Sequence, residues 1–414
     1  VCMIWSVMMR SLFLSLLLVG ASWATTTYQG QQVWRLHVPM ESTNSVQSLL
    51  SRMELDVWGD GREWVDVRVE PHQQRQLADA LGVRGVQHTV NIPDLDKLIA
   101  EERSSLGNRQ QGLRIDTGAY NQWEDIESYL GELDAENPLV TVTSIGQTYE
   151  GRQLLVAKVA TESFAPKPSV WFDCGIHARE WITPATCLWG LDRMTSGVDD
   201  GLNSLLDKYD VYMMPVHNPD GYHYTWHDDR MWRKNRQVYD DNMCDGVDLN
   251  RNFDDGHWGG IGTSDNSCSD TYHGPSAFSE LEAQAVRDYA TSLYENANLT
   301  AFFTIHSYSQ LWMYAYGYSA DVVPEHDDLD RVSKVGVDAL TAVHGTDYEY
   351  GSIYSAIYPA SGTSVDWGYS IGVAHTYTLE LRDKGSSGFL LPATEIIPCA
   401  EETWAGLVAA MLAI

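Results

Sequence analysis

Positive charge is scarce in this chain of 414 residues, where 27 Lys and Arg stand against 57 Asp and Glu and the formal net charge is −30. Nucleic acids and anionic membranes bind clustered positive charge, so both are excluded as partners. No two cysteines are spaced as Cys-x-x-Cys, which argues against a zinc site built from cysteines. Beyond the N-terminus, no apolar run approaches the roughly 18 residues of a membrane-spanning helix.

Residues 8–24, MMRSLFLSLLLVGASWA, have the pattern of a secretory signal peptide. One basic residue precedes an apolar core of roughly ten residues, and small residues follow near Ala21 and Ala24, where cleavage is expected. A buried helix is the alternative. The signal-peptide interpretation assigns residues 1–24 to the signal and predicts a soluble protein that is secreted to the extracellular space.

The cysteines agree with an oxidising compartment. After Cys2, five cysteines remain, and an odd number allows at most two internal bridges and one free thiol. The pairs that lie near each other in sequence, Cys174 with Cys187 and Cys244 with Cys268, are plausible bridges. Counting alone does not determine the pairing.

Residues 25–114 have the alternating pattern of a small α+β domain. Strand-like patterns cover residues 27–38, 64–69 and 85–92, and helical patterns cover 42–53, 72–82 and 93–103. Such close alternation predicts a split βαβ, ferredoxin-like fold.

The segment 104–118 is polar and contains glycine, Arg109 and Arg114, as expected of an exposed linker that proteases can cut. A small domain, a cleavable linker and a large domain behind a signal peptide together indicate a zymogen. An ordinary interdomain linker is the alternative.

Residues 115–414 predict one large α/β domain. Apolar strand-like runs at 153–160, 169–175, 210–218, 300–307 and 374–381 alternate with helical patterns such as 279–295 and 327–345. Apolar strands separated by helices predict a largely parallel sheet that is covered on both faces. Ligands of such sheets gather beyond the carboxyl ends of strands, where GIHARE (175–180), IHSYS (305–309) and LELRD (379–383) lie.

His177, Glu180 and His306 follow two of these runs and make up a candidate metal site. Two imidazoles and a carboxylate form a three-ligand set for catalytic zinc, with the fourth position left to water. Each histidine by itself is more often structural or exposed than a ligand, so the other residues of the site decide the interpretation.

Three further groups fit chemistry beside such a metal. Glu380 closes an apolar run, where it suits a general base, although an ion pair with Arg382 is the alternative. Arg233 lies in the basic segment RMWRKNR, and Asn250 and Arg251 lie in DLNRNF. Guanidinium and amide donors match a carboxylate-bearing substrate or a polarised carbonyl, whereas a surface basic patch is the alternative.

The ordered motifs HARE-W, NPDGY, MWRKNR, VDLNRNF, TYHGPSAFSE, IHSYSQ, IYPASG and ELRD resemble the secreted zinc metallocarboxypeptidases of the pancreatic A/B family. The resemblance covers nearly all of residues 115–414, and residues 25–114 resemble the family's activation peptide. It implies a mixed, mostly parallel eight-stranded sheet between helices, one zinc ion per chain, and removal of single residues from peptide or protein C-termini.

Carried over position by position, the resemblance assigns a role to each predicted site residue. It implies zinc ligands at His177, Glu180 and His306, catalytic roles for Glu380 and Arg233, substrate binding by Asn250, Arg251, Tyr358, Arg179, Tyr308, Ile353, Val365 and Thr378, and disulfides Cys174–Cys187 and Cys244–Cys268 with Cys399 free. Asp248 and Ser307 are implied as supporting residues, and Asp248 is expected to hold a zinc-binding histidine.

The pocket-floor position, acidic in B-type relatives, is Val365 here. An uncharged floor favours aliphatic or aromatic C-terminal residues, since a buried Lys or Arg would lack a partner. Thr363, where relatives usually have glycine, predicts a narrower pocket. We therefore expect a monomeric A-type procarboxypeptidase, activated by a trypsin-like cut after Arg109 or Arg114. The alternatives are a B-type enzyme that releases Lys or Arg and a non-catalytic, peptide-binding relative.

Overall fold

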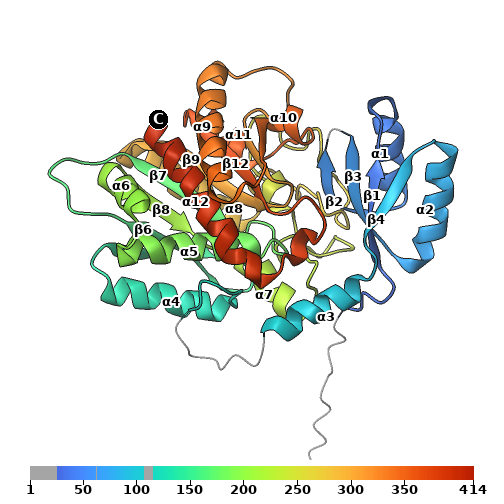
Figure 1. Ribbon diagram of the computed structural model, residues 1–414, viewed down its shortest axis with the longest axis horizontal. Coiled ribbons are helices and arrows are strands. Elements are labelled where there is room, and N and C mark those ends of the chain that lie inside the picture. The colour runs from blue at the N-terminus through green and yellow to red at the C-terminus, as the bar shows by residue number, and fades with distance from the viewer. Residues whose placement is uncertain (1–25, 62, 107–114) are drawn as a thin grey trace, which may run out of the picture.

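The computed structural model of the chain describes residues 26–61, 63–106 and 115–414. The predicted signal peptide, residues 1–24, and both predicted cleavage positions, Arg109 and Arg114, lie outside these residues and stay predictions. The described residues form two sheets, a small one near the N-terminus and a large one that occupies most of the molecule (Figure 1).

The small sheet has the ferredoxin-like topology that the sequence predicts. Its elements are β1 (Gln32–His37), α1 (Thr43–Arg52), β2 (Asp56–Gly61), β3 (Trp64–Val69), α2 (Pro71–Val83), β4 (Gln87–Ile92) and the following α3 (Leu95–Leu106). The strands lie in the order β2-β3-β1-β4, and each neighbouring pair is antiparallel. Strand β2 was not predicted, because its sequence DVWGDG contains two glycines and two aspartates and lacks a regular apolar alternation.

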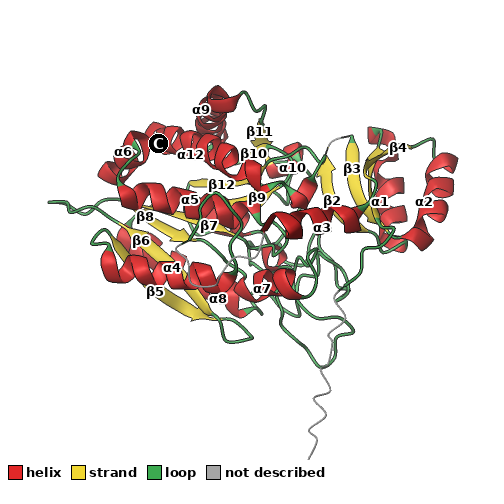
Figure 2. Cartoon of the chain, turned by 60° about the horizontal axis from the view of Figure 1, so that its bottom comes forward, coloured by secondary structure: helices red, strands yellow, loops and turns green. Residues whose placement is uncertain are grey.

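The two faces of the small sheet bury different partners. Helices α1 and α2 cover the face that points away from the large sheet, and they pack on it through residues such as Leu49 and Leu77 (Figures 1 and 2). On the other side, Trp58 and Ile99 pack against Tyr308 and other apolar residues of the large domain. The small domain is therefore docked through a buried apolar contact.

The large sheet is mixed and has eight strands, which confirms the predicted fold class. Its strands are β5 (Val140–Gln147), β6 (Gln153–Val159), β7 (Ser169–Cys174), β8 (Asp210–Met214), β9 (Leu299–Ser307), β10 (Leu311–Tyr314), β11 (Glu349–Ser352) and β12 (His375–Leu381). Their order is β11-β10-β12-β9-β7-β8-β6-β5. The central strands β12, β9, β7 and β8 are parallel to their neighbours within this group.

Helices cover both faces of this sheet (Figure 2). They are α4 (Trp123–Glu136), α5 (Ile182–Ser196), α6 (Asp200–Lys208), α7 (Pro219–His227), α8 (Leu281–Ala297), α9 (His326–His344), α10 (Ile353–Ala356), α11 (Ser364–Ser370) and α12 (Ile396–Ala413). One apolar core joins the sheet to α4, α5, α6, α9 and α12, and a second core joins the opposite face to α8 and α11. Both faces are buried, as the apolar strands predict.

Strand register brings the predicted site together at one edge. In the parallel pair of β9 and β12, His306 lies opposite Glu380. On the other side of β9, Cys174 at the end of β7 lies opposite Ile305, and His177 follows three residues later. Parallel strands end at the same edge, so residues more than a hundred positions apart in sequence become neighbours.

Both predicted disulfides are confirmed. Cys174 is bonded to Cys187, which joins the end of β7 to α5, and Cys244 is bonded to Cys268 within the long loop segment after α7. Cys399 is free and buried in α12.

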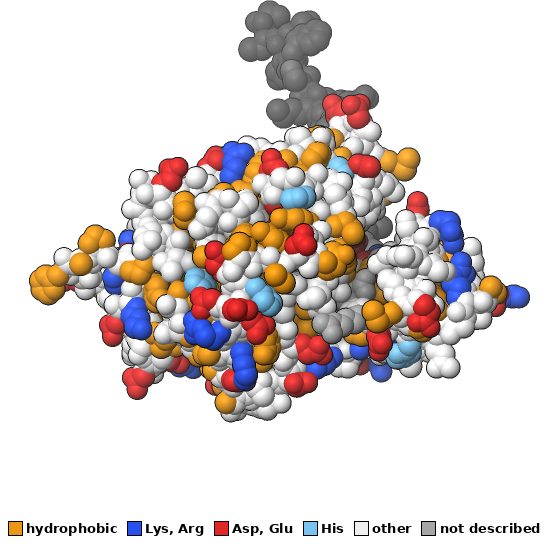
Figure 3. All heavy atoms as spheres, turned by 90° about the horizontal axis from the view of Figure 1, so that it is seen from above, with side chains coloured by type: hydrophobic (Ala, Val, Ile, Leu, Met, Phe, Trp, Pro, Cys, Tyr) orange, Lys and Arg blue, Asp and Glu red, His pale blue; other side chains and the backbone are white. Residues whose placement is uncertain are grey.

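Charged side chains of both signs lie on the exterior of the molecule. On the face shown in Figure 3, Lys and Arg side chains lie scattered among Asp and Glu. Within the described residues, one segment, Ala393–Ala413, is long and apolar enough to cross a membrane, but 61% of its apolar window is buried. This segment contains α12, which packs on α5, α6 and α9 as a core helix.

Candidate active site

A cavity at the carboxyl ends of β7, β9 and β12 gathers every predicted metal, catalytic and substrate-binding residue except Arg179. Its lining is Trp58, Gly59, His177, Glu180, Arg233, Asn250, Arg251, His306, Ser307, Tyr308, Met313, Ile353, Ile357, Tyr358, Ala360, Thr363, Val365, Thr378 and Glu380. Residues from two domains and many separate segments therefore face one space.

His177, Glu180 and His306 are buried and form a compact donor set, with their ligand atoms within 4.8 Å of one another. The Nδ1 atoms of the two histidines are 3.1 Å apart, and Nδ1 of His177 is 2.7 Å from Glu180 Oε1. His306 Nδ1 is 3.3 Å from the other oxygen of Glu180. Two imidazole nitrogens and one carboxylate directed at a common point fit zinc, which takes this ligand set in catalytic sites.

Neighbouring groups orient both imidazoles. Nε2 of His177 is 3.0 Å from Asp248 Oδ1, so a proton on Nε2 leaves the Nδ1 lone pair directed at the other ligands. Nε2 of His306 lies 3.3 Å from Thr304 Oγ1, which itself donates to Asp173, and 3.4 Å from Asn250 Nδ2. Burial and then the charge of Arg233 lower the pKa of His177, against the carboxylates, and favour the neutral form that binds metal.

Glu380 lies at the end of β12, and its Oε2 is fully buried without a hydrogen-bond partner among the described residues. Burial raises the pKa of Glu380 well above its ordinary value, and the charge of Glu180 adds to this effect. Arg233 and Arg251 oppose it. A buried carboxyl with an unused oxygen beside a metal site is suited to accept a proton from water.

The alternative of an ion pair between Glu380 and Arg382 is wrong. Arg382 instead binds Glu395, with Nη1 2.7 Å from Oε2, and forms a bidentate ion pair with Glu402 on α12. The guanidinium therefore faces α12, and the buried Oε2 of Glu380 has no partner among the described residues.

The basic segment 230–236 is not a surface patch. Arg230 and Lys234 are buried, and Arg233 lines the cavity. Arg233 Nη2 donates to Asp248 at 2.9 Å, and Nη1 lies 3.8 Å from Glu180. Asp248 thus holds both His177 and Arg233, which fixes the arginine beside the metal ligands.

Asn250 and Arg251 lie in a short 3-10 turn, Leu249–Arg251, that Asp248 caps at its N-terminus. The Arg251 guanidinium donates from Nε to the Gly262 carbonyl at 2.9 Å and from Nη1 to the Asn250 carbonyl at 2.8 Å. The Tyr358 ring lies 5.9 Å from this guanidinium. Fixed guanidinium and amide donors at the cavity wall are suited to a carboxylate.

Apolar and neutral side chains form another part of the wall. Ile353, Val365 and Thr378 were predicted there, and Met313 and Ile357 were not. Met313 could not be found from its own sequence context, since it reaches the cavity only because β10 pairs with β12 and places it opposite Thr378. Ile357 directly precedes Tyr358 in the motif IYPASG, so the sequence did contain a signal that Ile357 lies at the cavity.

The small domain covers the cavity. Trp58 and Gly59 of β2 are part of the lining. Asp56 accepts from Arg179 Nη1 at 3.1 Å, and Tyr308 donates to Asp66 at 2.9 Å. Arg179 and Tyr308, the two predicted outer substrate residues, are therefore both occupied by carboxylates of the small domain.

A buried ion pair completes this docking. Arg230 donates from Nε to Glu102 on α3 at 2.6 Å and from Nη2 to the second carboxylate oxygen at 2.9 Å. Arg230 is also held by the carbonyls of Arg179 and Phe389. The pair therefore connects the small domain to the backbone next to the metal ligands.

Comparison with known proteins agrees with this geometry. Residues 126–406 match the zinc carboxypeptidase family, and residues 34–102 match the carboxypeptidase activation peptide. The chain is 41% identical to carboxypeptidase A1 of Homo sapiens over 416 residues, which cover 97% of this chain and 98% of that protein.

Two further relatives show how widely the likeness extends. Carboxypeptidase B of Bos taurus is 40% identical over 387 residues, 91% of each chain. The crystal structure of carboxypeptidase A from Helicoverpa armigera matches with a TM-score of 0.86 at 29% identity and covers 93% of this chain and 98% of that one. The chain therefore belongs to the zinc carboxypeptidase family, and an activation peptide precedes its catalytic domain.

Proposed function

We propose that this metallocarboxypeptidase is of the A type and releases single aliphatic or aromatic residues from peptide C-termini. The observation that carries the proposal is the neutral wall of the cavity around Val365, which is only 1% exposed. The side chains beside it, Met313, Ile353, Ile357 and Thr378, carry no charge. A C-terminal Lys or Arg entering this space would bury its charge without a partner.

Thr363 adds a limit on size. It lines the cavity, and its side-chain oxygen accepts from the Asp366 amide at the start of α11, which holds it in place. The extra atoms of a threonine at this position narrow the space, so we expect smaller apolar residues to be tolerated better than the bulkiest ones.

The residues of this chain divide the catalytic work. When bound by His177, Glu180 and His306, zinc would act as a Lewis acid that polarises a carbonyl and lowers the pKa of water to about 7. Glu380 takes a proton from the attacking water and returns it to the leaving amine. Arg233 donates hydrogen bonds to the oxyanion that develops on the scissile carbonyl.

Binding of the substrate terminus precedes this chemistry. Arg251 and Asn250 hold the terminal carboxylate, because their donors face the cavity from a turn that Asp248 caps. Tyr358, which lines the same cavity, covers the bound residue. Once the small domain has left, Arg179 and Tyr308 are free to contact residues further along the substrate.

Activation follows from the position of the small domain. Residues 25–114 are the proposed removable part and 115–414 the catalytic part, with a trypsin-like cut after Arg109 or Arg114. The contacts of Asp56 and Asp66 with Arg179 and Tyr308 support inhibition by occupation of the outer substrate residues. The disulfides and the signal-like segment support secretion, and we expect a monomer.

The B-type alternative stays open because carboxypeptidase B of Bos taurus is 40% identical, nearly the same as the A-type relatives. The test treats recombinant protein with trypsin and measures release from matched peptides that end in Phe, Leu, Lys or Arg, with and without a zinc chelator. Release of Phe or Leu that the chelator abolishes is expected. Faster release of Lys or Arg would overturn the A-type assignment, and no release at all would favour the non-catalytic, peptide-binding alternative.

A further inference from the structure

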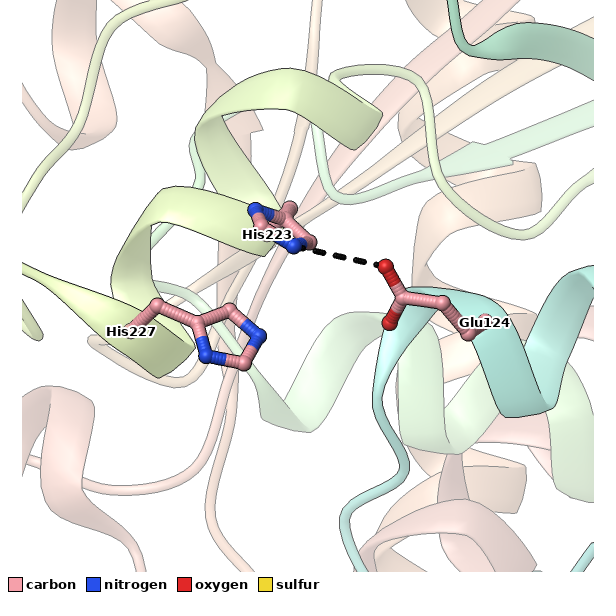
Figure 4. Close-up of side chains that lie close together, drawn as sticks. All are labelled: Glu124, His223 and His227. Carbon is pink, nitrogen blue, oxygen red and sulfur yellow. Dashed lines mark ion pairs between the residues drawn. The ribbon is translucent and has the colours of Figure 1, made fainter. Parts of the chain in front are cut away.

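A second group of metal-ligating side chains lies outside the active site, on the surface of the catalytic domain. Glu124 is in the first turn of α4, and His223 and His227 are on α7. Their ligand atoms all lie within 4.8 Å of one another. Figure 4 shows the two imidazoles and the carboxylate around a shared space between the helices.

Helix geometry explains why the two histidines act together. Residues four positions apart lie one above the other on the same helix face. The rings of His223 and His227 are accordingly 4.3 Å apart between centroids, with 37° between their planes. Glu124 faces them from the neighbouring helix, with Oε1 3.4 Å from His223 Nε2.

The backbones that carry the three ligands are held together independently of the ligands. Asn218 caps α7 by accepting from the Gly221 amide at 2.9 Å. Tyr222, next to His223, is buried and donates to the Asn121 carbonyl at 2.6 Å, three residues before Glu124. The two segments that carry the ligands are therefore already held next to each other before an ion binds, which lowers the entropic cost of binding.

A simple surface ion pair between His223 and Glu124 does not account for the group. Both side chains are partly exposed, and a solvent-exposed ion pair contributes little to stability. An imidazole nitrogen can instead offer its lone pair to a metal ion. An ion pair would also leave the position of His227 unexplained.

We propose that Glu124, His223 and His227 bind a second zinc ion, which joins α4 to α7. Imidazole nitrogen and carboxylate oxygen suit zinc and related transition metals, whereas calcium and magnesium prefer oxygen ligands alone. Glu124 is 50% and His223 28% exposed, unlike the buried catalytic set, so this site exchanges zinc with the solvent. Its ion acts on stability, because it joins two helices that are neighbours only in the folded state.

The experiment measures zinc per chain in the full-length protein after equilibrium dialysis against buffered free zinc. Wild type is expected to hold two equivalents, and His227→Asn and Glu124→Gln are expected to hold one. His344→Asn is the matched control, since His344 also pairs with a surface glutamate, at 3.0 Å from Glu401, but belongs to no three-ligand group in the described residues. The control is expected to keep two equivalents.

Thermal unfolding gives a second measurement. Added zinc is expected to raise the melting temperature of wild type and of His344→Asn, since an ion that binds only the folded state stabilises it. The melting temperature of His227→Asn is expected not to rise with added zinc. Calcium is expected to have no such effect. One equivalent in wild type, two equivalents in His227→Asn, or a second equivalent found only in dimers would each overturn the proposal.

Discussion

At the residue scale, the environment of Glu380 separates a proton acceptor from a metal ligand. Its buried Oε2 has no hydrogen-bond partner among the described residues, while the three ligating side chains contact one another. This difference in contacts leads to a testable difference in what each substitution removes.

We expect Glu380→Gln to lower kcat by about 10²–10⁴-fold without loss of zinc, because general acid–base catalysis contributes about that much. The measurement is kcat on a peptide ending in Leu together with zinc per chain. His306→Gln is the comparison and is expected to lose catalytic zinc. Loss of zinc in Glu380→Gln as well would show that Glu380 holds the metal rather than the reacting proton.

Val365 offers the corresponding test of specificity. We expect Val365→Asp to lower kcat/KM for peptides ending in Phe or Leu and to raise it for Arg by about tenfold or more, since a buried carboxylate gains a partner only from a basic residue. Val365→Asn, which is similar in size to Val365→Asp but uncharged, is the control. It is expected to lower kcat/KM for peptides ending in Phe or Leu without raising kcat/KM for peptides ending in Arg. An equal gain with Val365→Asn would mean that size, not charge, sets the preference.

At the element scale, the start of α8 carries a buried carboxyl that the mechanism does not use. Glu282 is 1% exposed, and its Oε1 has no hydrogen-bond partner among the described residues. Burial raises the pKa of Glu282 from 4.5 to about 8, and the charge of Glu280 adds to the effect. The folded protein therefore keeps a proton here that the unfolded chain releases.

The raised pKa determines the sign of the pH dependence. The contribution of the protonated carboxyl is fully present below pH 4.5 and is lost as pH rises through about 8. We expect urea unfolding to show wild type losing stability relative to Glu282→Gln across this window, by up to about 1.4 kcal/mol per pH unit. Parallel stability curves for the two proteins would show that Glu282 is already ionised in the fold.

The strands show which elements can be predicted. Apolar runs identified β6, β7, β8, β9 and β12, since a strand buried on both faces must be apolar throughout. Strand β2 was missed because its residues suit an edge that faces another domain rather than a core. β10 and β11 are only four residues each, so they carry too little pattern to recognise.

At the scale of the whole molecule, the small domain is docked over the cavity of the catalytic domain. The pair of Glu102 with Arg230 is buried at this interface, with the side chains 6% and 1% exposed. Breaking a buried pair by removing one partner costs about 3–5 kcal/mol, because the other charge stays buried. Removing one partner therefore destabilises the form of the protein in which the small domain is docked.

We expect Glu102→Gln to raise the basal activity of the uncut protein by about tenfold or more, since each 1.4 kcal/mol of lost docking energy is about a tenfold change in the open population. The measurement compares hydrolysis before and after trypsin treatment. Residue 102 lies in the part removed, so cut wild type and cut variant have the same chain and must have equal activity. An unchanged basal activity would show that this pair does not hold the small domain closed.

The sequence by itself determined the local chemistry of this protein. The apolar strand runs predicted a largely parallel α/β sheet, because that pattern depends on residue type and short spacing. The resemblance of the ordered motifs to the zinc carboxypeptidases implied the family and the residues around the cavity. The domain boundaries and the individual residue roles remain proposals.

Only the tertiary structure decided which distant groups meet. Strand pairing placed Met313 beside Thr378, and helix packing turned Arg382 toward Glu402 and away from Glu380. Packing of α4 on α7 likewise brought Glu124 to His223, 99 positions away in sequence. Such contacts depend on register and on interaxial geometry, which are set by the whole core and not by the residues that touch.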